Sequence, residues 1–110
     1  LNLQIQEETG MLIKHAATAG TIESSDVRVM IEPAEAGSEI LLESPVLQRY
    51  GRQIRQVTAE TLRLLKVENA KVSLVDRGAL DCTIRARVEC AVYRAADAAE
   101  SGIAWGGTIE

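Results

Sequence analysis

The feature that most constrains the fold of this chain is an amphipathic segment at residues 45–66 with a short apolar run on either side. Ser44 and Pro45 favour a helix start, because the serine oxygen can accept a hydrogen bond from a free backbone N–H and proline has no N–H to satisfy. The helix is predicted to end near Lys66, and at about 100° per residue its apolar residues share one face. These residues are Leu47, Tyr50, Ile54, Val57, Leu64 and Leu65, with Leu62 at the edge.

The apolar runs beside this helix, EILLE at 39–43 and KVSLV at 71–75, predict two strands. If both belong to one sheet, the helix between them is a right-handed crossover that covers one face of the sheet. Residues 27–32 predict a further strand, because Val, Val and Ile alternate there with Arg, Met and Glu. The short connection PAEAGS favours an antiparallel hairpin between 27–32 and 39–43.

Residues 80–96 fit two patterns. Small and aliphatic residues alternate from Cys82 to Val92 as in a strand, whereas Ile84, Val88 and Ala95 share one face of a helix. An uninterrupted pattern of this length, rich in Ala and Arg and preceded by Asp81 as a candidate cap, exceeds the usual strand. The length therefore favours a helix.

A chain of 110 residues with 46% hydrophobic and 25% charged residues is typical of one globular domain with a single core. The predicted order is β-β-α-β-α, which gives a two-layer α+β domain with about three strands and two helices packed on one face. We expect an N-terminal tail at residues 1–15, the domain at 16–96, and a flexible tail at 97–110 that contains Trp105. If translation starts at Met11, residues 1–10 do not belong to the natural chain.

The charge and the cysteines exclude several classes of function. Twelve basic against sixteen acidic residues give a net charge of -4, which argues against nucleic acid as a partner. No run approaches the roughly 20 apolar residues of a membrane span, and the N-terminus lacks the order of a secretory signal. We therefore expect a cytoplasmic protein without a membrane partner. Cys82, Cys90 and the single His15 form no metal-binding set, so both cysteines are expected to be reduced core residues.

Five basic residues gather on the face of the predicted helix opposite its apolar face. They are Arg49, Arg52, Arg55, Arg63 and Lys66, and we call them the basic stripe. Such a stripe is usually the solvated side of an amphipathic helix. The alternative is a surface that binds an anion or an acidic partner.

No catalytic constellation is present, so the chain is not predicted to be an enzyme by itself. Ser24 and Ser25 stand in the segment TIESSD, after Gly20 and directly before the 27–32 strand. Loop serines commonly satisfy nearby backbone groups. An exposed hydroxyl can also be the point where another enzyme attaches a group whose chemistry the side chain lacks.

The residues AGTIES at 19–24, followed by Asp26 and a strand, resemble the small acyl carrier (gamma) subunit of citrate lyase. A second match, DRGALDCTIRARVE at 76–89, is similar to that family's Asp-x-Gly-Ala-Leu-Asp-Cys block and the Ala/Arg helix after it. The two motifs have the family's order and a similar spacing over residues 11–96. The resemblance implies an acyl carrier domain at 16–96 and places the family's starting Met at Met11.

The resemblance also implies a prosthetic group and partners. Ser24 would carry triphosphoribosyl-dephospho-CoA through a phosphodiester, and the thiol of this group would hold acetyl and citryl thioesters during cleavage of citrate to oxaloacetate and acetate. The transferase (alpha) subunit, the lyase (beta) subunit and the transferase that attaches the prosthetic group are the implied partners. The carrier itself catalyses neither step.

Some alternatives stay open. Glycine commonly follows the modified serine in the family, whereas Ser25 stands here and is the second candidate for attachment. Glu23 and Asp26 match no ligand role and are expected to be solvated. The carrier subunit of malonate decarboxylase uses similar chemistry, although the GALDC block favours citrate lyase. An unmodified α+β interaction module that docks through the basic stripe is the rival from another class.

Overall fold

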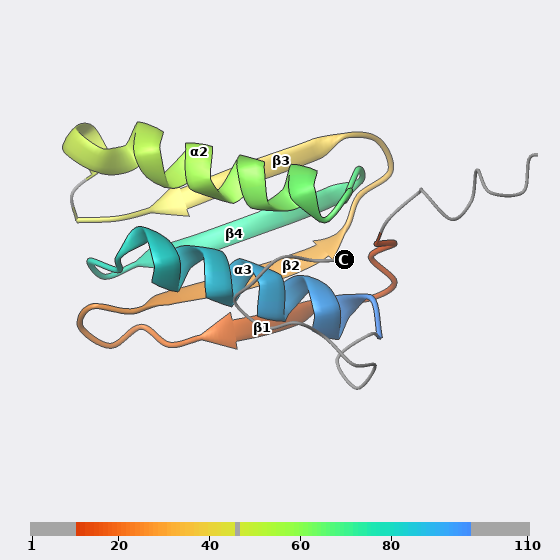
Figure 1. Ribbon diagram of the computed structural model, residues 1–110, viewed down its shortest axis with the longest axis horizontal. Coiled ribbons are helices and arrows are strands. Elements are labelled where there is room, and N and C mark those ends of the chain that lie inside the picture. Colours follow the sequence, from red (N-terminus) through yellow and green to blue (C-terminus); the bar gives the residue numbers. More distant parts are fainter. Residues whose placement is uncertain (1–10, 46, 98–110) are drawn as a thin grey trace, which may run out of the picture.

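The computed structural model describes residues 11–45 and 47–97, except the side chains of residues 47–49. A four-stranded sheet forms one layer, and two helices cover the same face of it (Figure 1). The strands are β1 (Ala17–Gly20), β2 (Val27–Pro33), β3 (Ser38–Glu43) and β4 (Ala70–Asp76), and the helices are α2 (Leu47–Leu64) and α3 (Asp81–Ala95). This confirms the two-layer α+β class, with one strand more than predicted.

The order of strands in the sheet is β1-β2-β4-β3. Strand β4 pairs antiparallel with β2 and parallel with β3, so the hairpin predicted between β2 and β3 is wrong. Burial explains the order, because Ala70, Val72 and Leu74 of β4 are at most 1% exposed, whereas Ile40 and Leu42 of β3 are only partly buried. Strand β4 therefore lies inside the sheet between β2 and β3, and β3 forms the edge. The parallel pairing of β3 and β4 through α2 confirms the predicted crossover.

Strand β1 has no counterpart in the sequence-based prediction. It pairs antiparallel with β2, from Ala17 opposite Ile31 to Gly20 opposite Arg28. Its four residues, ATAG, include one buried side chain, Ala19. Alanine and glycine have low strand propensity, and four residues are too few to show an alternating pattern.

The core lies between the sheet and the helices and is mainly aliphatic, with Tyr93 of α3, 4% exposed, as an aromatic member. The sheet contributes Val27, Val29, Ile31, Val72 and Leu74, and α3 contributes Ile84, Val88 and Val92. Residues 81–95 are a helix, as their length predicted. Leu80, not Asp81, is the N-cap residue, and it makes no side-chain cap hydrogen bond.

The buried face of α2 differs in part from the predicted one. Ile54, Val57, Leu62 and Leu65 are buried, but Tyr50 and Leu64 are 46% and 62% exposed. Gly51, Thr58 and Thr61 are buried as well. The two threonines tolerate burial because each hydroxyl donates to the carbonyl oxygen four residues earlier and is thereby satisfied within the helix. Leu47 lies in α2 with its side chain outside the description.

The ends of α2 also differ from the prediction. The helix begins at Leu47, two residues beyond Pro45, and the Ser44 hydroxyl donates to the Asp76 carboxylate at 2.8 Å. It ends at Leu64, and Lys66 follows with a φ of 60°. The Val67 N–H then bonds to the Leu62 carbonyl oxygen at 2.9 Å, which satisfies one of the last carbonyls of the helix.

Residues 11–15, which we expected in the N-terminal tail, lie against the domain. Ile13 is buried, the Met11 N–H donates to the Leu65 carbonyl oxygen, and the Lys14 N–H donates to that of Ala95. Residues 1–10 and 98–110, and with them Trp105, lie outside the described residues.

Candidate functional site

The loop that joins β1 to β2, residues 21–26, contains both candidate serines. It lies at the end of the sheet where β3 and β4 also end (Figure 1). Gly20 leads into it with a φ of +88°, and a Cβ there would stand 1.9 Å from the Val27 carbonyl oxygen. Only glycine fits this close approach of two backbone segments, so the loop closes tightly on the start of β2.

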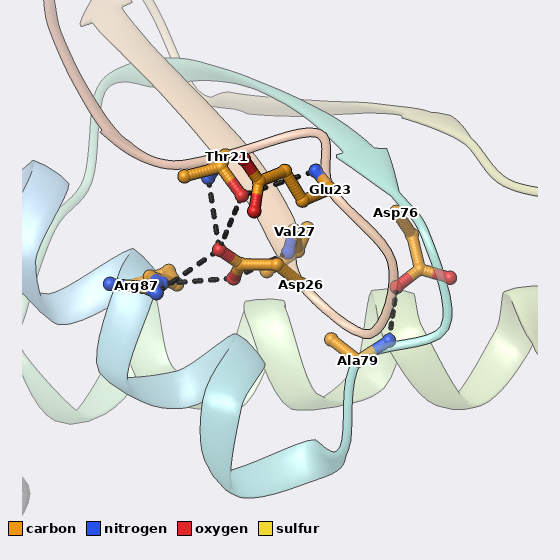
Figure 2. Close-up of polar contacts among 7 residues, drawn as sticks. All are labelled: Thr21, Glu23, Asp26, Val27, Asp76, Ala79 and Arg87. Carbon is orange, nitrogen blue, oxygen red and sulfur yellow. Dashed lines mark hydrogen bonds and ion pairs between the residues drawn. The ribbon is translucent and has the colours of Figure 1, made fainter.

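The Asp26 carboxylate holds this loop in shape (Figure 2). Its Oδ2 accepts hydrogen bonds from the Thr21 hydroxyl at 2.7 Å and the Thr21 N–H at 3.2 Å. Its Oδ1 accepts from the Val27 N–H at 2.7 Å. From α3, Arg87 donates through Nε to Oδ1 and through Nη2 to Oδ2, both at 3.1 Å. Two-point pairing of this kind fixes orientation as well as distance.

The same contacts set the charge of Asp26. Desolvation by burial alone would raise the pKa of this carboxyl. Hydrogen bonds from Thr21, Arg87 and the Val27 N–H, together with the charge of Arg87, outweigh it and lower the pKa to about 2. Asp26 is therefore ionised at neutral pH, and its charge is paired with Arg87.

The two serines have different backbone roles. Ser25 has a φ of 67°, in the left-handed region that favours glycine, and its N–H donates to the Arg77 carbonyl oxygen at 2.7 Å. Ser24 is exposed on the turn, and its hydroxyl has no hydrogen-bond partner among the described residues. Glycine adopts such a left-handed backbone without the steric cost that a side chain brings.

The loop between β4 and α3 lies directly against the serine loop. The Arg77 N–H donates to the Asp26 carbonyl oxygen at 2.9 Å, next to the bond from Ser25 to Arg77. Asp76, only 1% exposed, accepts from the Ala79 N–H at 3.0 Å and so shapes the turn into α3 (Figure 2). The segments 19–26 and 76–89, far apart in sequence, thus form one structural unit.

The structure corrects two expectations about side chains. Asp26 is not a solvated flank, because its side chain is 14% exposed and paired with Arg87. Its charged partner Arg87 lies 61 residues away, so no local pattern could reveal the pair. The sequence did indicate a structural role for Asp26, because an Asp directly before a strand can accept hydrogen bonds from backbone N–H groups. Glu23 is exposed, as expected. Cys82 is exposed, not buried, while Cys90 packs partly against the core.

The basic stripe runs along α2 and just beyond its end. Arg52, Arg63 and Lys66 are exposed. Arg55 is exposed too, but its Nη1 donates to the Ile40 carbonyl oxygen of β3 at 2.7 Å, so it also ties the helix to the edge strand. The side chain of Arg49 lies outside the description.

Across the described residues 11–45 and 47–97, no three or more His, Cys, Asp or Glu side chains gather as metal ligands would. The helices within the described part of the chain are also too short or too polar to cross a membrane.

Comparison with known proteins assigns the chain first to a class. A family model for acyl carriers, described as the malonate decarboxylase delta subunit (MdcD), matches residues 14–95. A chain in the crystal structure of a Pseudomonas malonate decarboxylase hetero-tetramer in complex with malonate has a similar fold, with a TM-score of 0.67 at 20% identity. The match covers 78% of this chain and 89% of that chain. The family model covers most of the chain and therefore places it in the class of acyl carriers.

Curated relatives narrow the class to one family. The citrate lyase acyl carrier protein of Lacticaseibacillus casei is 54% identical over 87 residues, which cover 79% of this chain and 86% of the relative. That of Vibrio cholerae is 54% identical over 88 residues, which cover 79% of this chain and 90% of the relative. The chain belongs to the citrate lyase acyl carrier protein family, as the motifs at 19–24 and 76–89 imply.

Proposed function

We propose that this chain is the acyl carrier subunit of a citrate lyase, and that Ser24 carries triphosphoribosyl-dephospho-CoA through a phosphodiester. The position of the Ser24 hydroxyl carries the proposal. It is exposed, has no hydrogen-bond partner among the described residues, and stands on a turn whose backbone is anchored at Gly20 and at Ser25. An enzyme that attaches a prosthetic group can therefore reach it without unfolding the domain.

The surroundings of Ser24 fit a bulky, negatively charged group. Ser24 is exposed, so a phosphodiester needs no cavity at its point of attachment. The nearby Asp26 carboxylate accepts five hydrogen bonds, two of them from the Arg87 guanidinium, which balances its charge. Asp26 therefore opposes a neighbouring phosphate less than a free carboxylate would.

In this proposal the chain positions the acyl group and catalyses no step of the reaction. When bound, the prosthetic group supplies a thiol that holds acetyl and citryl groups as thioesters. Asp26, Arg87 and strand β2 fix the base of the serine loop to the domain, so the attached group starts from a defined point. Tethering replaces free diffusion of the acyl group to each active site by a high effective concentration.

Partner subunits complete the proposed enzyme. They are the transferase (alpha) and lyase (beta) subunits, and the transferase that attaches the prosthetic group acts before them. The exposed arginines of the basic stripe are the proposed contact surface. The proposed location is the cytoplasm, which agrees with the two unpaired thiols of Cys82 and Cys90.

A carrier subunit of malonate decarboxylase is the second candidate, favoured by the description of the family model and by the fold of the Pseudomonas structure. The higher identity to citrate lyase carriers supports the first candidate. Purification from the native host separates the two through the subunits that accompany the chain. The intact mass separates both from an unmodified interaction module, because only a carrier has a large covalent adduct.

Substitution of each serine tests the attachment site. In a host that makes the prosthetic group and its transferase, Ser24→Ala should abolish the mass adduct and citrate cleavage by the reconstituted complex. Ser25→Gly is the matched control and should retain both, since glycine adopts a φ of 67° without strain. A phosphodiester mapped to Ser25, or an active Ser24→Ala complex, would contradict the assignment.

A further inference from the structure

A cavity of about 400 Å³ lies between the first half of α2 and the loop that leads from β4 into α3. It is distinct from the serine loop, and its size falls within the range of small-molecule pockets, roughly 300–1,000 Å³. Apolar side chains, aliphatic and aromatic, and the backbone of the loop provide most of its walls. These residues are Tyr50, Ile54, Gly78, Ala79 and Leu80, and the polar Gln53 of α2 lines the pocket beside them.

The pocket begins close to Ser24. The Ser25 N–H is 2.7 Å from the Arg77 carbonyl oxygen, and Gly78 is the next residue and lines the pocket. Standard backbone dimensions then place the Cα atoms of Ser24 and Gly78 within about 8 Å of each other. A long, flexible arm attached to the Ser24 hydroxyl can span this gap.

The charges of the pocket favour uncharged occupants. Two acidic residues, Asp76 and Asp81, are among its lining residues, and no basic residue is among those that the structure describes. Gln53 Nε2 donates to Asp81 Oδ2 at 2.8 Å, which joins α2 to the first residue of α3 at the wall of the pocket. Leu80, 70% exposed, and Tyr50, 46% exposed, offer apolar surface at its mouth.

We infer that this pocket binds the thiol-bearing end of the arm attached at Ser24 while the thiol is free or carries an uncharged acyl group, and that it excludes an acyl group that bears carboxylates. Amide and alkyl groups of such an arm match the mixed apolar and polar walls, whereas Asp76 and Asp81 repel negative charge. The inference rests on the proposed function, because it needs the arm on Ser24.

Tethering makes even weak binding sufficient. A short flexible link gives an effective concentration on the order of 1 mM. A pocket with a dissociation constant of about 0.1 mM would then be occupied about 90% of the time. The arm thiol would be protected from reagents in solution about tenfold, which a chemical reaction can measure.

The test uses the full-length chain with the prosthetic group attached and with Cys82→Ser and Cys90→Ala, so that the arm holds the one remaining thiol. Iodoacetamide should alkylate this thiol about tenfold more slowly than in the same protein with Leu80→Glu, which places a charge at the mouth of the pocket. Leu64→Glu is the matched control, because Leu64 is 62% exposed at the other end of α2 and should leave the slow rate unchanged.

A second measurement compares two caps of similar size on the thiol, one neutral from iodoacetamide and one anionic from iodoacetate. The amide NMR signals of Gly78 and Leu80 should shift relative to the unmodified chain with the neutral cap and return toward their unmodified positions with the anionic one. Equal alkylation rates together with unmoved amide signals would overturn the inference. A chain without the mass adduct would instead overturn the proposed function, so the two failures are distinguishable.

Discussion

Asp26 connects the serine loop to α3 through Arg87, and its charge is part of the folded structure. Asp26→Asn keeps the shape but removes the charge that Arg87 pairs with. The folded-state pKa of about 2, against an ordinary value of 3.8, corresponds to about 1–2 kcal/mol of stability, with the lower figure allowing for solvent screening at this loop. Urea denaturation of both proteins at pH 7 should show a loss of this size.

The same substitution predicts a pH dependence. Because the folded-state pKa of Asp26 lies below its unfolded value of 3.8, its contribution is present above about pH 4 and is lost as the pH falls toward 2. The difference in unfolding free energy between the wild-type protein and Asp26→Asn should therefore shrink over that range. Glu23→Gln is the control at an exposed carboxylate and should change stability by no more than about 0.5 kcal/mol. A constant difference from pH 7 to pH 2 would contradict the role given to this ion pair.

Gly20 and Gly37 offer a matched test of backbone constraint. Both have positive φ, +88° and +79°, but a Cβ at Gly20 would stand 1.9 Å from the Val27 carbonyl oxygen, while a Cβ at Gly37 would meet nothing within 4 Å. Gly37→Ala should cost only the left-handed backbone conformation, about 1–2 kcal/mol. Gly20→Ala should cost about 3 kcal/mol or more and displace the serine loop, measured by thermal unfolding and by loss of the proposed adduct at Ser24.

At the scale of elements, the faces of α2 decide which side chains stabilise the fold. Ile54 and Val57 are 5% and 7% exposed, whereas Leu64 on the same helix is 62% exposed. Ile54→Ala should cost roughly 2–5 kcal/mol because it leaves a cavity in the core. Leu64→Ala should stay within about 0.5 kcal/mol. Equal losses on chemical denaturation would show that the helix packs on a different face.

Most helices and strands were predictable from the sequence. Helices α2 and α3 and strands β2 to β4 each have a run or a repeating pattern of apolar residues, or a length, that favours one type of element. Their pairing was not. A short connection between β2 and β3 permits a hairpin, and only the greater burial of β4 in the folded sheet decides against it. Local pattern also could not predict the contact of Asp26 with Arg87, since it forms only when α3 packs beside β1 and β2. The predicted buried face of α2 lacked Thr58 and Thr61, because polar residues are expected at the surface. Both can be buried because their hydroxyls form hydrogen bonds within the helix.

At the scale of the whole molecule, the proposed functional features gather at one end of the sheet. The serine loop, the loop into α3 and the start of α2 lie there together (Figure 1). The basic stripe extends from this end along α2 in a chain whose net charge is -4. This concentration of positive charge on one face of α2 is the reason why we propose it as a surface for an acidic partner.

A double charge reversal tests whether the basic stripe binds the partner subunits. Arg52→Glu with Arg63→Glu should weaken assembly with the transferase and lyase subunits, and the loss should diminish as salt screens the charges. Arg55 is left unchanged, because its bond to the Ile40 carbonyl oxygen supports the fold.

A control pair of substitutions lies on the sheet. Arg28→Glu with Lys71→Glu makes the same change in net charge on the strands β2 and β4, at positions paired with Val75 and Glu32. If the stripe is the contact surface, affinity measured over a range of salt concentrations should fall for the helix pair and not for the strand pair. Equal effects would reflect net charge alone, and unchanged affinity in both would leave the stripe as the solvated face of α2.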